Sequence, residues 1–163
     1  MASLNDPLAQ QLLNGRYIGS LATQRPDGSL HIVAVWFWFD GKQVYIATAS
    51  RSRKAQNVQA NAAAALMIDS RDPAASCGIT ISGKVDTLTG EATRDPNHRI
   101  HTKYMSAAAI ADPKVGPVFA VWDDITLRLT PQSVVAWDMR VADQQAFGGS
   151  FAKNPDYLLP LER

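Results

Sequence analysis

The residues best suited to chemistry form a basic and hydroxyl-rich cluster within residues 41–68, a segment that contains no Asp or Glu. Arg53 and Lys54 fall where a predicted strand gives way to a predicted helix. Their charges and the free N–H groups of the first helical turn can therefore converge on one anion. The nearby hydroxyl groups belong to Thr48, Ser50 and Ser52. The pattern indicates a phosphate-binding turn, and a solvated basic loop is the alternative.

A second signal is the aromatic run of residues 36–39, Trp-Phe-Trp-Phe. On one strand these side chains would point to both faces, which is more aromatic surface than a protein leaves in water. We expect Trp38 and Phe39 to pack in the core and in a subunit interface. Trp36 and Phe37 can also border a ligand.

Other reactive residues lack the partners that chemistry would require. His98 and His101 are three positions apart on a predicted helix, but no third ligand accompanies them, so we predict no metal site. His31 and the single cysteine, Cys77, are expected to be structural. Ser150 does not fit the G-x-S-x-G motif of hydrolases. The sequence identifies no catalytic side chain.

The elements that position the basic turn are predicted from turn signals and apolar patterns. We expect a helix over residues 7–14, strands over 17–23 and 30–39 joined by Pro26-Asp27-Gly28, and a hairpin at Asp40-Gly41 leading into a strand over 44–48. A helix follows the basic turn, and a buried strand ends near residue 68.

The second half of the chain continues with strands. We predict a strand over 77–89 with a bulge or close approach at Gly83, a helix over 95–111, and strands over 118–129 and 134–137. About seven strands joined by tight turns predict a mainly β (α+β) fold, a split antiparallel β-barrel with two to three flanking helices. The Gly-x-Gly-x-x-Gly motif of dinucleotide-binding proteins is absent.

Composition limits the organisation and the partners. The 163 residues suit a single domain, 1–163, whose polar end, 142–163, is predicted to be a C-terminal arm. Sixteen basic and 15 acidic residues give a net charge of +1, which argues against a nucleic-acid or membrane partner. One cysteine and no signal-peptide pattern suggest a cytoplasmic protein.

The strand that begins at His31, the Asp40-Gly41 turn, Ala47-Thr48 and Ser52-Arg53-Lys54 together resemble the pyridoxamine 5'-phosphate oxidase-like family of split β-barrels. The resemblance covers roughly residues 15 to 138. It implies a homodimer that binds FMN, or in one branch the deazaflavin F420, between subunits. It also implies a small-molecule substrate.

The resemblance implies a role for each matching residue. The strand of Ile32, Val33, Ala34, Val35, Trp36 and Phe37 would border the flavin ring and ribityl chain, beside Ala47 and Thr48. Arg53 and Lys54 would bind the phosphate, helped by Ser52 and Ser50. Trp137 or Arg140 of the late segment would help to close the cleft.

Three departures from the family's FMN oxidases affect the choice of substrate. Those oxidases carry arginine, lysine and glutamine where this chain has Ile32, Phe37 and Gly78. The resemblance implies an FMN-dependent oxidoreductase, and these three departures argue against pyridoxamine phosphate as its substrate. The alternatives are an F420-dependent reductase and a non-catalytic flavin-binding protein, and nothing in the chain singles out a haem-iron ligand.

Overall fold

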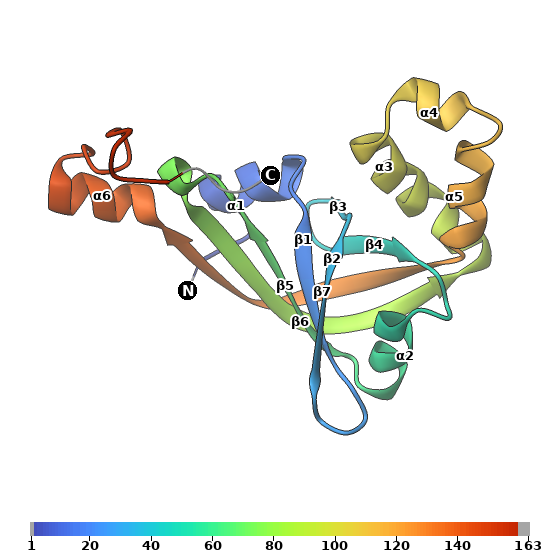
Figure 1. Ribbon diagram of the computed structural model, residues 1–163. Coiled ribbons are helices and arrows are strands. Elements are labelled where there is room, and N and C mark those ends of the chain that lie inside the picture. The colour runs from blue at the N-terminus through green and yellow to red at the C-terminus, as the bar shows by residue number, and fades with distance from the viewer. Residues whose placement is uncertain (1, 160–163) are drawn as a thin grey trace.

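The computed structural model describes residues 2–159, which form one antiparallel sheet with helices around it (Figure 1). The seven strands are β1 (Gly19–Gln24), β2 (Leu30–Val35), β3 (Trp38–Phe39), β4 (Val44–Thr48), β5 (Ala63–Asp69), β6 (Cys77–Thr89) and β7 (Ile125–Asp138). Their order across the sheet is β2-β1-β5-β6-β7-β4-β3. Because β2 and β3 are the two edges and are joined by only two residues, the sheet must curl until its edges approach each other. This arrangement confirms the predicted split barrel.

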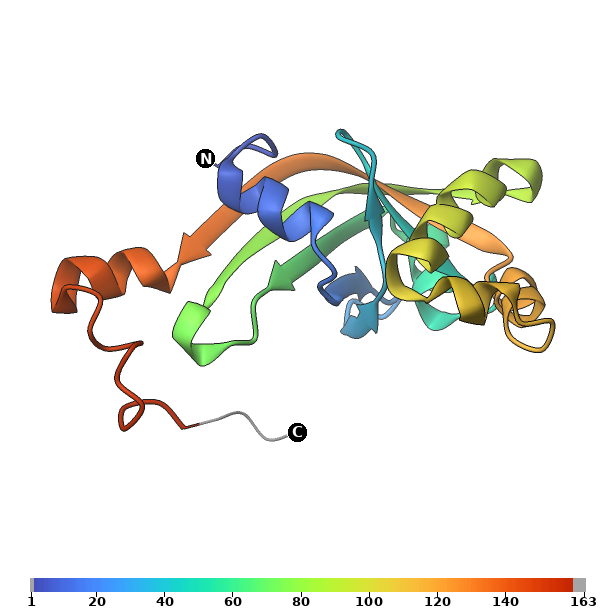
Figure 2. The same ribbon diagram turned by 90° about the horizontal axis from the view of Figure 1, so that it is seen from above.

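The described residues also form six α-helices, more than the two or three expected. They are α1 (Pro7–Asn14), α2 (Arg53–Ala60), α3 (Arg94–Tyr104), α4 (Ala107–Ala111), α5 (Gly116–Trp122) and α6 (Met139–Phe147), with short 3-10 turns η1 (Pro73–Ala75) and η2 (Gly90–Thr93). Helices α3–α5 form a lobe at one end of the sheet, and α6 lies at the opposite end (Figures 1 and 2). None of the helices within residues 2–159 is long and apolar enough to cross a membrane.

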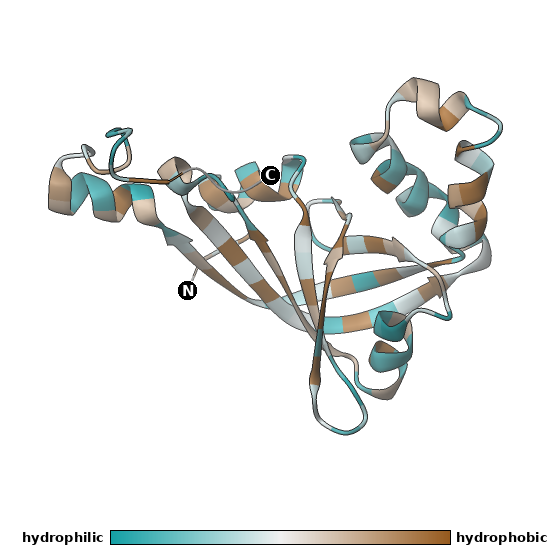
Figure 3. Cartoon of the chain, in the orientation of Figure 1, coloured by the Kyte–Doolittle hydropathy of each residue, from teal (hydrophilic) through white to brown (hydrophobic). Residues whose placement is uncertain are grey.

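Alternating hydrophobicity along the strands builds the core, as Figure 3 shows. In β4 every second residue, from Val44 through Ile46 to Thr48, is buried. Leu12 and Leu13 of α1 are fully buried in the same core cluster as Leu66 of β5. One face of the curled sheet is therefore packed against the core residues. The opposite face is the one that can contact other molecules.

The predicted bulge at Gly83 is confirmed. The register of β6 and β7 shifts between Ser82 and Gly83, and a Cβ atom at Gly83 would lie 2.1 Å from the carbonyl oxygen of Thr130. β7 continues through Pro131, which pairs with Gly83 at this irregularity. A proline is tolerated within the sheet because the ladder is already interrupted at that point.

Three predicted elements were wrong in part. The strand over 30–39 breaks at residues 36–37, where the chain passes from one sheet edge to the other. The helix over 95–111 ends at Tyr104, because Ser106 caps a new helix by accepting from the N–H of Ala109. Residues 118–122 are helical instead of extended, since Pro117 occupies the first turn of α5 and favours a helix start there.

Candidate functional site

A pocket of about 380 Å³ gathers five of the predicted site residues. They are Ala34, Val35, Trp36, Ala47 and Lys54. The first three come from β2 and the link to β3, the fourth from β4, and the lysine from the first turn of α2. The pocket therefore combines an apolar wall with a cation at a helix N-terminus, which suits a ligand with an apolar body and an anionic end.

Hydroxyl groups organise the start of α2. Ser52 is the N-cap, and its Oγ accepts a hydrogen bond from the Ala55 N–H at 3.4 Å. The buried Thr48 donates from Oγ1 to Ser52 Oγ at 3.1 Å. Both hydroxyls are engaged in holding the turn. Arg53, the first helical residue, is exposed and forms no hydrogen bond or ion pair with any described residue, so its guanidinium is free for an anion.

Lys54 is half-buried beside the carboxylate of Asp123. Burial lowers the pKa of Lys54, and the negative charge of Asp123 opposes that effect. An anion placed against this ammonium would favour its charged form further. Because Lys54 is more buried than Arg53, we expect it to bind an anionic group more strongly than Arg53 does.

Asp123 is itself held in place by α3. Its Oδ2 lies 2.8 Å from Nε2 of His101, and its carbonyl oxygen accepts from Asn97 Nδ2 at 2.7 Å. Asn97 Oδ1 accepts in turn from the buried Thr126 hydroxyl at 2.6 Å. This network fixes the carboxylate between the helical lobe and the pocket.

Ser50, predicted as a helper for the phosphate, is bound by another acid. Its N–H and its hydroxyl each donate to the Asp124 carboxylate at 2.6 Å. These hydrogen bonds lower the pKa of Asp124. Ser50 therefore ties the loop before α2 to the loop before β7, and its hydroxyl has a partner within the protein.

Trp36 is fixed by aromatic stacking on both sides. Its ring lies 5.1 Å from Tyr104 at an interplanar angle of 5°, and 5.9 Å from Phe119 at 13°. The Tyr104 hydroxyl donates to the carbonyl oxygen of Tyr17 at 2.6 Å, and burial raises the pKa of Tyr104 to about 12. Trp36 thus forms a rigid wall, with Tyr104 firmly anchored and Phe119 carried by the peripheral α5.

The remaining predicted strand residues face different ways. Ile32 points outward and is 66% exposed, whereas Val33 is half-buried against the core. The Phe37 side chain is fully buried in the core, under the ammonium of Lys103 at 3.9 Å from the ring centroid. The Phe37 side chain therefore belongs to the core, and the prediction that this residue borders a flavin stays a prediction.

The other two aromatic residues divide between core and surface. Phe39 is buried in the core, as expected. Trp38 is half-buried, packs against Tyr45 at 5.1 Å and carries the guanidinium of Arg99 at 4.9 Å over its ring. Both are accounted for by contacts within the chain.

Gly78 has a specific packing role. It pairs across the sheet with Trp137, and a Cβ atom at Gly78 would lie 2.6 Å from the indole ring. Trp137 therefore occupies the space above this position. A longer side chain here would have to displace the tryptophan.

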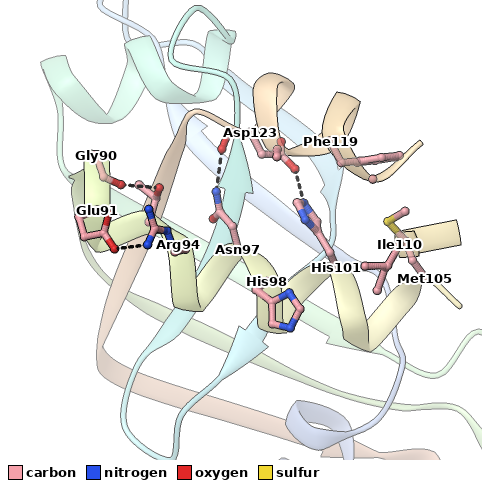
Figure 4. A pocket seen from close by; sticks show the side chains of 13 residues that line it. Gly90, Glu91, Arg94, Asn97, His98, His101, Met105, Ile110, Phe119 and Asp123 are labelled. Atoms are coloured by element: carbon pink, nitrogen blue, oxygen red, sulfur yellow. Dashed lines mark hydrogen bonds and ion pairs between the residues drawn. The ribbon is translucent and has the colours of Figure 1, made fainter. Parts of the chain in front are cut away.

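A second pocket, of about 430 Å³, lies in the helical lobe between α3 and the α4–α5 pair (Figure 4). His98 and His101 both line it, but His101 is bound to Asp123 and His98 is exposed. Within residues 2–159, no group of three or more His, Cys, Asp or Glu side chains is placed to hold a metal ion. Cys77 is buried, and burial raises the pKa of its thiol.

Sequence reasoning missed Ile18, Ile100, Phe119 and Asp123, which complete the first pocket. Phe119 and Asp123 come from a segment far along the chain from the basic turn. No local motif marks them. In the structure Asp123 acts on Lys54 and Asp124 binds Ser50. The two adjacent acidic residues could therefore have been proposed as partners of the basic turn on grounds of charge.

Comparisons with known proteins agree with this architecture. The family model for pyridoxamine 5'-phosphate oxidase matches residues 6–133. The solved structure of the conserved hypothetical protein Rv2991 from Mycobacterium tuberculosis is similar, with a TM-score of 0.70, 21% identity, and coverage of 86% of this chain and 87% of that one. An F420 reductase gives a TM-score of 0.61 and 24% identity over 77% of this chain and 94% of that one.

A putative pyridoxamine 5'-phosphate oxidase from Listeria innocua has a TM-score of 0.59 and 16% identity, over 78% of this chain and 93% of that one. At these identities the structural likenesses show the fold alone. No curated protein matches the chain significantly. The match of the family model over most of the sequence shows more: the chain belongs to the pyridoxamine 5'-phosphate oxidase family of flavin- and deazaflavin-binding split barrels.

Proposed function

We propose that the protein is a flavin-dependent oxidoreductase that binds FMN, with F420 as the alternative cofactor. The observation that carries this proposal is the shared pocket of Trp36, Ala34 and Lys54. It places an apolar aromatic wall at one end and a half-buried cation at a capped helix start at the other. A flavin mononucleotide has the same two parts, a planar ring system and a phosphate.

The residues at the start of α2 fit a phosphate. The first-turn N–H groups of a helix attract anions, and those of Arg53 and Lys54 have no hydrogen-bond partner within residues 2–159. Arg53 has no partner within residues 2–159, and Lys54 gains from a neighbouring anion because burial disfavours its charge. Together they would hold the phosphate from two sides.

The bound flavin would supply the redox chemistry, which the side chains of this protein do not provide. The chain's contribution is to bind, orient and shield. Trp36 is held by Tyr104 and forms part of the apolar wall, and Ile100 and Val35 would exclude water from a ring beside it. Lys54 and Asp123 are the two charged side chains among the lining residues, so they would provide the electrostatic contacts to a ligand.

Packing supports a substrate other than pyridoxamine phosphate. Ile32, Phe37 and Gly78 replace polar residues of the vitamin-forming oxidases, and Phe37 is fully buried in the core. Trp137 covers Gly78. Because Phe37 is buried and Gly78 is covered, neither position can present a polar side chain to a ligand.

We further propose that two copies of the chain enclose the cofactor. The outer face of the sheet carries exposed apolar side chains at both sides, including Ile32 of β2 at 66% and Val135 of β7 at 60% exposure. Between them the register aligns Ala34, Ser20, Met67 and Thr80 with Val135. An exposed surface of small and apolar residues is typical of a homodimer interface.

The proposal is tested by absorption spectra of the purified protein before and after addition of FMN or F420, with free ligand removed by gel filtration. We expect one of the two to remain with the protein at one molecule per chain. Retention of FMN would assign the flavin, and retention of F420 the deazaflavin. A protein that retains neither would contradict the proposal.

A further inference from the structure

The two pockets are neighbours with a common wall. Phe119 and Asp123 line both the pocket at Lys54 and the pocket in the helical lobe. On one side of the wall the Phe119 ring stacks on Trp36, and on the other it meets the edge of His101 at 5.6 Å. A ligand on either side would therefore contact the same aromatic ring.

The lobe pocket has a polar and an apolar end (Figure 4). Arg94 and Glu91 form an ion pair of 2.7 Å at one end. Met105, Ile110 and Phe119 lie at the other. The apolar end adjoins the shared wall, so an apolar group would be the part of a ligand that lies nearest to the first pocket.

The segment that carries Phe119 is bound to α3 at Asp123 but buries no side chain of its own. Neither α4 nor α5 contains a buried side chain, and Val121 and Trp122 are 75% and 58% exposed. The two helices are locked together at Gly116, where a Cβ atom would lie 2.2 Å from the Ile110 carbonyl oxygen. Asp123 keeps the end of α5 on α3, but the Phe119 side chain can change its position without opening a buried core.

We propose that Phe119 is a gate and a specificity-determining residue, and that the lobe pocket takes the apolar, ring-bearing part of a substrate. This inference rests on the proposed function in one respect, that the pocket at Lys54 holds the flavin. Reacting groups must approach to about 3–3.5 Å. A substrate in the lobe pocket reaches a ring lying on Trp36 only when Phe119 leaves its stacked position.

The test uses protein labelled with 4-fluorophenylalanine and titrated with 2-naphthol, a neutral bicyclic ring, without any cofactor. The chain has five phenylalanines, so fluorine resonances can be assigned with single Phe→Leu variants. In the free protein, the stacked Trp36 ring should shift the fluorine resonance of Phe119. Naphthol should move it toward the position of the exposed Phe147, whose own resonance should stay in place.

A second arm measures affinity in variants. Phe119→Trp should weaken naphthol binding about tenfold by filling the apolar end, and the matched control Phe147→Trp on α6 should leave it unchanged. An unmoved Phe119 resonance, or equal affinities for wild type and Phe119→Trp, would overturn the gate. Since no cofactor is present, these outcomes are independent of FMN and F420 binding, whose absence would instead contradict the proposed function.

Discussion

Substitution of Lys54 by Met should remove the more buried of the two phosphate contacts while keeping the aliphatic stem. Lys54 is half-buried, and the nearest charge that acts on it is Asp123. A hydrogen bond to a charged group contributes about 1.5–3 kcal/mol, or roughly a 10- to 150-fold change in Kd. Arg53 is exposed, so solvent screening limits its contribution to about 1 kcal/mol.

The assay compares FMN with riboflavin, which has the same ring and no phosphate. Fluorescence titrations should show that Lys54→Met weakens FMN by the stated factor and leaves riboflavin nearly unchanged. Lys42→Met is the matched control, because Lys42 is exposed in the β3–β4 turn. If the chain prefers F420, the same variants are titrated with F420. Equal losses for FMN and riboflavin, or none for either, would refute the phosphate assignment.

Three further predictions concern assembly and stability. Ile32→Glu should convert a dimer to a monomer in sedimentation velocity, because it places a charge on the exposed sheet face, while Ser29→Glu in the β1–β2 turn should not; a dimeric Ile32→Glu protein would contradict the interface. Gly83→Ala should lower the free energy of unfolding by about 1–3 kcal/mol in chemical denaturation, since its Cβ meets the Thr130 carbonyl, and an unchanged midpoint would contradict that contact. Burial lowers the pKa of Lys103 from 10.5 to about 8, so the unfolded chain binds more protons between these values and stability should rise with pH there; Lys103→Met should lack this rise, and parallel curves would refute it.

Local signals predicted the parts of the site that lie on one stretch of chain. Ser52 caps α2 and Lys54 faces the pocket, because a polar cap followed by helix-forming residues fixes both the helix start and its first turn. The Asp40-Gly41 turn pairs β3 with β4, as expected. These features depend on neighbours in the sequence.

The helical lobe could not be predicted in the same way. Residues 118–122 are short, apolar and partly β-branched, and such a run does not distinguish a strand from a helix. Phe119 and Asp123 reach the pocket only because the fold brings the end of α5 next to residues of β2, β4, α2 and α3. Phe37 was assigned to the ligand side by the family resemblance, which does not report that its side chain is fully buried in the core.

The position of the cofactor can be observed in a crystal structure of the protein grown with the cofactor that it retains. We expect the phosphate within hydrogen-bonding distance of Arg53 and Lys54, and the ring against Trp36 and Ala34 with a second chain closing the cleft. A phosphate held elsewhere, or a ring bound away from the strand of residues 34–36, would contradict this expectation.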